Sequence, residues 1–320
     1  MAWPRWLGSL PRRRRGHSGA GIATAPSGPT GPLVDEVLLR RLERLSLVPR
    51  RPVAGGVGGE HRSSARASST DFADYRPYLP GDDFRRIDWN AYGRFGTLYV
   101  KLTEAREQLP VHILLDASRS MAWGEPAKLQ YASQVAATLG YVALARFDRL
   151  TVTALGEEPR QLPAVRGRGR LGHLLTFLSD VQPSGAVDLA AALSAYRVDR
   201  RAGGLAILIS DLLSPDGYED GLDKLLQAGL DVIVLQVLSP QELDPAEGGD
   251  VELVDAETGE IVEVSLTPRM IAVYRERLDR WCAEAEAICA RRGISYCRVA
   301  TDTPLEDLLL DQLRRVGILR

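Results

Sequence analysis

The sequence contains few residues of the kinds that bind transition metals or form disulfides. Its three cysteines lie near the C-terminus, with no paired CxxC spacing and no histidine nearby: Cys282, Cys289 and Cys297. The four histidines follow no ligand spacing either: His17, His61, His112 and His173. These shortages argue against a zinc site. We expect reduced, packed thiols in a cytoplasmic protein, and a structural role for His112 within a strand.

Long apolar runs are also missing, since no segment approaches the roughly 18 residues that a membrane-spanning helix needs. The basic cluster 12–15 is followed by glycine, serine and alanine, which does not match the apolar core of a signal peptide. The 40 basic residues nearly balance the 42 acidic ones, so the net charge of -2 predicts no nucleic-acid binding. Peripheral membrane association through a partner or the basic tail stays open.

The composition changes twice along the chain. Residues 1–32 are rich in Gly, Pro, Ser and Arg, which predicts a disordered basic tail. Residues 33–109 begin with leucines at helical spacing over 33–48 and continue as a long irregular module with a strand at 98–102. We expect the principal domain to span residues 110–320.

Apolar runs and helical patterns alternate through residues 110–320. The predicted strands are 111–116, 149–155, 205–213, 231–238 and 294–300. The predicted helices are 127–147, 171–178, 189–196, 218–228, 268–290 and 304–316. Buried strands separated by helices predict an α/β fold with a doubly wound, mostly parallel sheet. Alternating residues around Gly259 predict a β-hairpin inserted near 250–265.

Three oxygen-bearing side chains follow the first of these strands with a DxSxS spacing: Asp116, Ser118 and Ser120. In open α/β sheets, ligands bind beyond the carboxyl ends of the strands. A carboxylate and two hydroxyls suit Mg²⁺ or another divalent cation, which takes oxygen ligands and keeps several waters. The alternative is structural: Asp116 orients the loop, and one of the serines caps the next helix.

The DxSxS motif resembles the metal-ion-dependent adhesion site of von Willebrand factor type A domains. That resemblance implies direct ligation by both serines and a second aspartate after a later strand, where Asp211 lies. It also implies a threonine from another loop, but the aligned residue is Val187, which offers no side-chain oxygen. Asp188 or Ser184 is a possible substitute ligand, water is another, and the remaining alternative is a weak or lost ion site.

A second motif, which we call the signature segment, spans residues 76–94 and combines a Pro-Gly-Asp-Asp turn with alternating charges. Its chemistry-bearing residues are Arg76, Tyr78, Gly81, Asp82, Asp83, Arg85, Asp88, Trp89 and Arg94. We expect ion pairs that either hold this loop or face a partner. The pattern R-x-Y-x-x-G-D-D-x-R-x-I-D-W closely resembles the bacterial domain-of-unknown-function family fifty-eight, with departures at Asn90 and at 92–93.

The family resemblance implies partnership with a MoxR-type AAA+ ATPase in a chaperone-like or complex-assembly role. We therefore expect a non-catalytic protein-binding module, acting through a degenerate adhesion site. The alternative is a metal-assisted hydrolase or phosphatase that uses the same aspartates. Against it, Ser118 stands where DxD phosphatases need a second acid, and the sequence has no GxSxG elbow or glycine-rich phosphate loop.

Overall fold

The computed structural model divides the chain into two compact units. The sheet unit comprises Met1–Ala54 and Leu109–Arg320, and the small unit comprises Gly55–Gln108. The residues that the structure describes are 9–13, 33, 35–50, 70–80, 82, 84, 87–105, 108–198, 203–245, 250–255, 261–265 and 267–320.

A six-stranded sheet forms the centre of the sheet unit, in the order β11-β8-β7-β4-β5-β6. Its parallel strands are β4 (Pro110–Asp116), β5 (Arg149–Leu155), β7 (Gly204–Ser210), β8 (Leu230–Leu238) and β11 (Ser295–Ala300). The edge strand β6 (Arg160–Val165), which sequence reasoning missed, runs antiparallel to β5. The strand order confirms the predicted doubly wound, mostly parallel α/β class.

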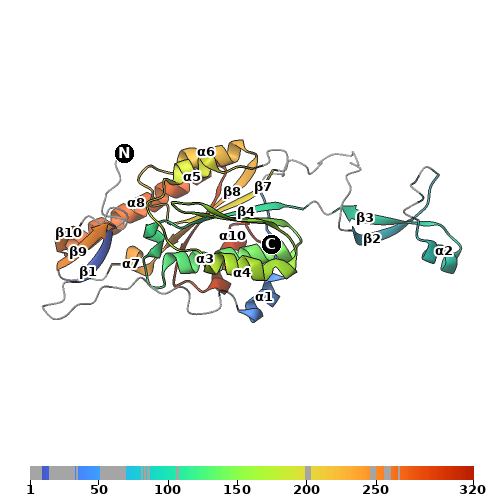
Figure 1. The fold of residues 1–320 in the computed structure, drawn as a ribbon, viewed down its shortest axis with the longest axis horizontal. Helices are drawn as coiled ribbons and strands as arrows, with labels where there is room; N and C mark the ends of the chain where they lie inside the picture. Colours follow the sequence, from blue (N-terminus) through green and yellow to red (C-terminus); the bar gives the residue numbers. More distant parts are fainter. Residues whose placement is uncertain are drawn as a thin grey trace. The chain divides into compact units, whose positions relative to one another are not determined.

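Helices cover both faces of this sheet (Figure 1), because successive strand residues point to opposite sides. On β4, Ile113 and Leu115 pack with α3 (Lys128–Ala145) and α4 (Leu171–Ser179). Leu114 packs instead with α5 (Leu189–Ala195), α6 (Glu219–Gln227) and α8 (Pro268–Arg292). Among the helices in the described ranges, none has both the length and the apolar character that a membrane span requires.

The predicted helix over 33–48 is shorter in the structure, where α1 spans Glu36–Leu42. The backbone beyond it bonds the C-terminus instead: Ser46 N donates to Arg320 O at 2.9 Å and Val48 N to Ile318 O at 3.0 Å. Leu38 and Leu42 lie in the core with α3. This segment therefore belongs to the sheet unit, which differs from its predicted grouping with residues 33–109.

A separate three-stranded sheet has the order β1-β9-β10. Strands β9 (Asp250–Asp255) and β10 (Ile261–Ser265) pair antiparallel, which confirms the predicted hairpin near 250–265. Strand β1 (Ser9–Arg13) pairs with β9, so the prediction of disorder throughout 1–32 is wrong for these five residues. The backbone groups of β9 explain the difference, because an open strand edge offers hydrogen bonds that composition does not reveal.

The small unit is built on an antiparallel pair, β2 (Thr70–Pro77) and β3 (Tyr99–Ala105). Along the sequence, α2 (Trp89–Phe95) lies between these two strands. It ends at Gly96, which has the left-handed conformation with φ 65°. Strand β3 was predicted at 98–102. Strand β2 and helix α2 were not predicted. The signature segment, residues 76–94, thus begins in β2 and ends in α2.

Candidate functional site

Asp116 ends strand β4 and is buried at the carboxyl end of the sheet. Its Oδ1 accepts a hydrogen bond from Ser118 N at 2.8 Å, which holds the following turn. Its Oδ2 accepts the hydroxyl of Ser210, at the end of the neighbouring strand β7, at 2.5 Å. Asp116 therefore orients its own loop and joins two adjacent strand ends, as the structural alternative expected.

The two serines of the DxSxS motif face each other, with 3.0 Å between Ser118 Oγ and Ser120 Oγ, and both are buried. Neither hydroxyl caps a helix in the predicted way: Ser118 occupies the N-cap of the 3-10 turn Arg119–Ala122 without a side-chain cap bond. The intervening Arg119 is exposed, and its backbone N–H donates to Gly185 O at 3.0 Å. The serine pair is thus enclosed by the loop that precedes α5.

That same loop carries the position where the resemblance implies a threonine. Val187 is buried there, so an apolar side chain faces the interior. Asp188 is exposed and caps α5, with its Oδ1 accepting from Ala191 N at 2.8 Å. Ser184 Oγ accepts from Glu157 N at 3.1 Å. Both substitute candidates are therefore already engaged in holding local backbone.

A lysine that sequence reasoning did not single out meets the second aspartate of the motif. Lys128, at the first position of α3, is 1% exposed, and its Nζ lies 2.7 Å from Asp211 Oδ2. The same Nζ lies 2.5 Å from Glu242 Oε1. We call these three residues the Lys128 triad. Fully buried lysines are rare unless paired, and here one ammonium bridges two buried carboxylates.

Local structure brings the members of the triad together from three different strand-to-helix connections. Asp211 follows β7, Lys128 follows the turn after β4, and Glu242 lies in α7 (Pro240–Leu243) after β8. Glu242 completes a capping box with Ser239, whose backbone N–H donates to Glu242 Oε2 at 2.7 Å. Gly124 has φ 102° and lies against Ser239, where an added Cβ would come within 2.6 Å of the Ser239 Cβ.

The charges of this cluster shift the proton affinities of its members. Burial, reinforced by the nearby charge of Asp211, raises the pKa of Asp116 from its ordinary value of 3.8 to about 6. Burial by itself would lower the pKa of Lys128. The carboxylates of Asp211 and Glu242 outweigh that effect and raise the pKa of the ammonium above its ordinary range. Lys128 is therefore a permanent positive charge inside the site.

The residues present do not fit a divalent cation at Asp211. Lys128 already neutralises this carboxylate, and Leu213 N donates to its other oxygen at 2.9 Å. Val187 supplies no oxygen from the second loop. Within the described part of the chain, no three His, Cys, Asp or Glu side chains gather as a metal-ligand group. The charge and hydrogen-bond requirements of the site are met by the chain itself.

The signature segment presents a different arrangement. Arg76 and Asp82 form an ion pair at 2.5 Å, and Asp82 Oδ2 accepts from Leu79 N at 2.9 Å, which confirms one expected Arg–Asp pair. Asp88 caps α2 by accepting from Asn90 N at 2.9 Å and from Ala91 N at 3.1 Å. Tyr78 N donates to Leu98 O. Gly81, Asp83 and Arg85 lie outside the described residues.

Helix α2 contains no buried residue, and three of its seven residues are aromatic. Trp89 is 63% exposed, Tyr92 45% and Phe95 71%. The rings of Trp89 and Tyr92 meet edge to face, with 6.3 Å between their centroids. Arg94, also exposed, lies in the last turn of the same helix. We call Trp89, Tyr92 and Phe95 the α2 aromatic patch.

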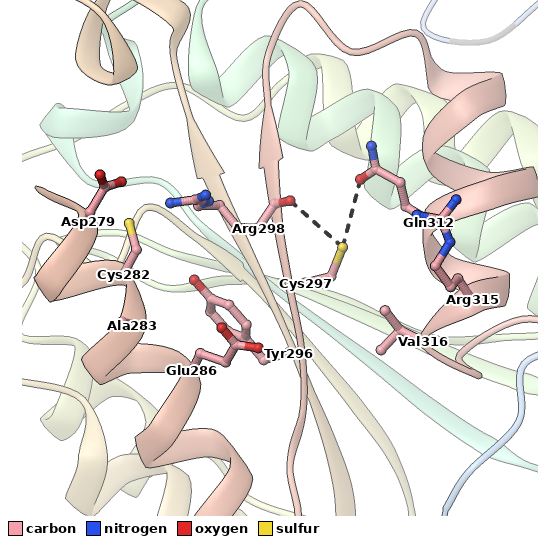
Figure 2. A pocket seen from close by; sticks show the side chains of 10 residues that line it. All are labelled: Asp279, Cys282, Ala283, Glu286, Tyr296, Cys297, Arg298, Gln312, Arg315 and Val316. Atoms are coloured by element: carbon pink, nitrogen blue, oxygen red, sulfur yellow. Dashed lines mark hydrogen bonds between the residues drawn. The ribbon is translucent and has the colours of Figure 1, made fainter. Parts of the chain in front are cut away.

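Two hollows lie away from Asp116. One, of about 460 Å³, opens between α8, β11 and the C-terminal helical segment; Figure 2 shows Cys282 and Cys297 among its lining residues. All three cysteines are buried free thiols, as expected. The other, of about 270 Å³, is lined in part by His112, whose Nδ1 lies 2.9 Å from Tyr196 Oη. Burial and then the charge of Arg149 lower the pKa of His112 to about 4, so this ring is neutral.

Sequence reasoning missed Lys128, Glu242 and Ser210. One signal was present for Lys128: a lysine at the first turn of a helix opposes the positive end of the helix dipole, so it needs a nearby negative partner. Glu242 carried the Ser-x-x-Glu spacing of a capping box. Nothing local connected Lys128 to its partners, because its contacts with Asp211 and with Glu242 each span more than eighty positions in the chain.

Both motifs of this chain fall within the match to a known protein family. The sequence profile of the family described as Protein of unknown function DUF58 matches residues 74–287. Uncharacterized proteins of Mycobacterium tuberculosis (Rv1480) and Mycobacterium bovis (Mb1516) are each 30% identical over 306 residues. These matches cover 92% of this chain and 94% of each relative. The profile includes both the signature segment and the DxSxS motif.

Solved structures with a similar arrangement are more distant in sequence. The conserved hypothetical protein BatB from Bacteroides thetaiotaomicron is 18% identical, with a TM-score of 0.42, and the match covers 65% of this chain and 98% of that one. An aerotolerance-related membrane protein from Bacteroides fragilis is 17% identical, with a TM-score of 0.36, and the match covers 60% of this chain and 91% of that one.

Proposed function

The chain belongs to the DUF58 family of proteins of unknown function, and from this premise we propose that it is a non-catalytic protein-binding module that docks a MoxR-type AAA+ ATPase. The docking surface in this proposal is the α2 aromatic patch of the signature segment. The three buried free thiols are consistent with action in the cytoplasm.

The observation that carries the proposal is the exposure of Trp89, Tyr92 and Phe95 on one short helix. Tryptophan, tyrosine and arginine supply most of the binding energy at protein interfaces, and Arg94 lies beside the aromatic residues. Large aromatic side chains exposed together are uncommon on the surface of a protein that works alone. Further exposed apolar residues, Leu79 and Phe84, lie in the same segment.

The metal-assisted hydrolase is less well supported by the same contacts. Hydrolysis would need an activated water or an activated nucleophile beside Asp116. Both oxygens of Asp116 already accept hydrogen bonds within the chain, and Ser118 and Ser120 are buried against each other. The Asp116 carboxylate also lies against the Ser118 side chain, but both of its oxygens are already held by Ser118 N and the Ser210 hydroxyl. We therefore propose that the aspartates of the motif have a structural role.

The test is a binding measurement between the full chain and a MoxR-type ATPase from the same genome, loaded with nucleotide. We expect Trp89→Ala and Phe95→Ala each to weaken the complex by at least about tenfold, as substitutions at interface anchors do. Met270→Ala is the matched control, because Met270 is an exposed apolar residue on α8 of the sheet unit. This control should bind like the unmodified chain.

Three outcomes would count against the proposal. Absence of any complex with the unmodified chain would remove the ATPase as the partner. Equal binding by the unmodified chain, Trp89→Ala and Phe95→Ala would remove the α2 aromatic patch from the interface. Turnover of a generic phosphoester or carboxyl ester that disappears in Asp116→Ala would favour the hydrolase instead.

A further inference from the structure

The Lys128 triad lies at the end of the sheet where the resemblance implies a metal ion, yet its cation is a side chain. We propose that the Lys128 ammonium is the resident cation of this site, and that it locks three strand-to-helix connections together with no divalent metal. This inference goes beyond the proposed docking function and does not depend on it.

The first support is the state of the carboxylate oxygens. Each of the six oxygens of Asp116, Asp211 and Glu242 accepts a hydrogen bond or an ion pair from the chain. The donors are Ser118 N, the Ser210 hydroxyl, Leu213 N, Ser239 N and, for one oxygen each of Asp211 and Glu242, Lys128 Nζ. An arriving divalent cation would therefore compete with donors that are already in place.

The second support is the charge and placement of Lys128 itself. Its Nζ lies 2.7 Å from Asp211 Oδ2, so a metal ion bound to the same carboxylate would face a positive charge at close range. The side chain is 1% exposed, and the Lys128 backbone N–H donates to Trp123 O, at the end of the preceding 3-10 turn, at 3.0 Å. The ammonium is therefore enclosed by the folded chain.

The third support is what the triad connects. Asp211 follows β7, Glu242 lies after β8, and Lys128 begins the helix after β4, so one ammonium joins the ends of three parallel strands. In the metal site that the resemblance implies, an exchangeable ion would link Asp116 after β4 with Asp211 after β7. Here a covalently attached cation makes the contacts to Asp211 and Glu242. The loops at this end of the sheet are accordingly held in one arrangement whatever the metal concentration.

The experiment uses the full chain and a lysine-directed acylating reagent, with mass spectrometry to measure the labelling of each site. The sequence has three lysines, Lys101, Lys128 and Lys224, and the exposed Lys224 on α6 is the internal reference. We expect Lys128 to be labelled at least about tenfold more slowly than Lys224, because a buried amine reacts only when the structure opens. Millimolar Mg²⁺ should leave that ratio unchanged.

A second measurement counts bound Mn²⁺ by electron paramagnetic resonance in the chelator-treated protein. We expect any Mn²⁺ binding to be the same in the unmodified chain, in Asp211→Asn and in Asp216→Asn, the last being an exposed aspartate on the loop after β7. Stoichiometric binding that is lost only in Asp211→Asn would overturn the proposal. So would faster labelling of Lys128 in Mg²⁺, or labelling at the rate of Lys224. If Asp211→Asn fails to fold, the labelling ratio of Lys128 to Lys224 in the unmodified chain, with and without Mg²⁺, still tests the proposal.

Discussion

The Lys128 triad and the α2 aromatic patch differ in which side chains they bury and which they expose. The triad removes three charged side chains from water and satisfies them within the chain. The patch leaves three aromatic side chains in water on a helix that buries nothing. Charged residues are normally outside and aromatic ones inside, so both regions depart from the usual distribution.

The difference separates stability from binding. Buried charges that are fully paired contribute rigidity and a defined arrangement, and their loss is felt by the whole unit. Exposed aromatic residues contribute little to folding, because they are already in contact with water in the folded state. The comparison therefore predicts large stability effects at the triad and small ones at the patch, and the following substitutions test this gradient in decreasing order.

The largest effect is expected from Lys128→Met, which leaves Asp211 and Glu242 buried without their counter-charge. Breaking a buried ion pair on one side costs about 3–5 kcal/mol, and urea unfolding of the sheet unit should show a loss of that size. Lys224→Met is the matched control on an exposed helix position and should stay within about 0.5 kcal/mol.

A triple variant makes this prediction sharper. Lys128→Met combined with Asp211→Asn and Glu242→Gln removes all three charges together, so no carboxylate remains unpaired. Part of the stability lost in Lys128→Met should return, because this variant leaves no buried charge without a counter-charge. If Lys128→Met alone were as stable as Lys224→Met, the triad would not stabilise the sheet unit.

The next effect depends on pH and concerns Asp116. Its pKa is raised to about 6, so the folded state binds a proton that the unfolded state releases near pH 4. The unmodified chain should lose stability as pH rises from about 4 to about 6, by up to about 3 kcal/mol for this group. Asp116→Asn, which has no charge to bury, should lack this loss.

The measurement is the difference in unfolding free energy between Asp116→Asn and the unmodified chain at pH 4, 5, 6 and 7. We expect the variant to gain relative stability through that range. Groups far from Asp116 titrate alike in both proteins, so they cancel from the difference. A difference that does not change with pH would mean that Asp116 titrates normally in the folded protein.

Much of the fold could be predicted from the sequence because its apolar runs carry their own periodicity. The buried strands β4, β7 and β8 are near-continuous Val, Ile and Leu, which only a sheet covered on both faces accommodates. Strand β6 was missed because it is an exposed edge that contains Pro163, a residue that weakens any strand prediction. Strand β1 was missed because its partner lies more than two hundred residues away.

The candidate site was predicted only in part, for a related reason. The DxSxS spacing located Asp116, Ser118 and Ser120 correctly at the end of a strand, since that motif is local. What decides their chemistry is the contact of Lys128 with Asp211, which depends on how α3 and β7 pack. A local pattern can nominate ligands, but it cannot show that another side chain already supplies the cation.

A smaller effect comes from the helix caps, where the two units offer the same chemistry. Asp88 caps α2 in the small unit and Asp188 caps α5 in the sheet unit, each through a side-chain oxygen and a backbone N–H. Alanine at either position should cost about 1 kcal/mol. Hydrogen exchange should report Asp88→Ala as faster exchange confined to α2, and Asp188→Ala as faster exchange in α5. Changes spread over both units in either variant would contradict this local role.

The smallest effect on stability is expected where the effect on binding is greatest. Trp89→Ala and Phe95→Ala remove aromatic rings that are more than half exposed, so the unfolding free energy should change by less than about 0.5 kcal/mol. Leu139→Ala, within the core against the sheet, removes fewer atoms than Trp89→Ala and should nonetheless cost about 2–5 kcal/mol. Urea unfolding of the three variants makes the comparison directly. If either aromatic variant lost as much stability as Leu139→Ala, the patch would be part of a folded core and would have to be withdrawn as a docking surface.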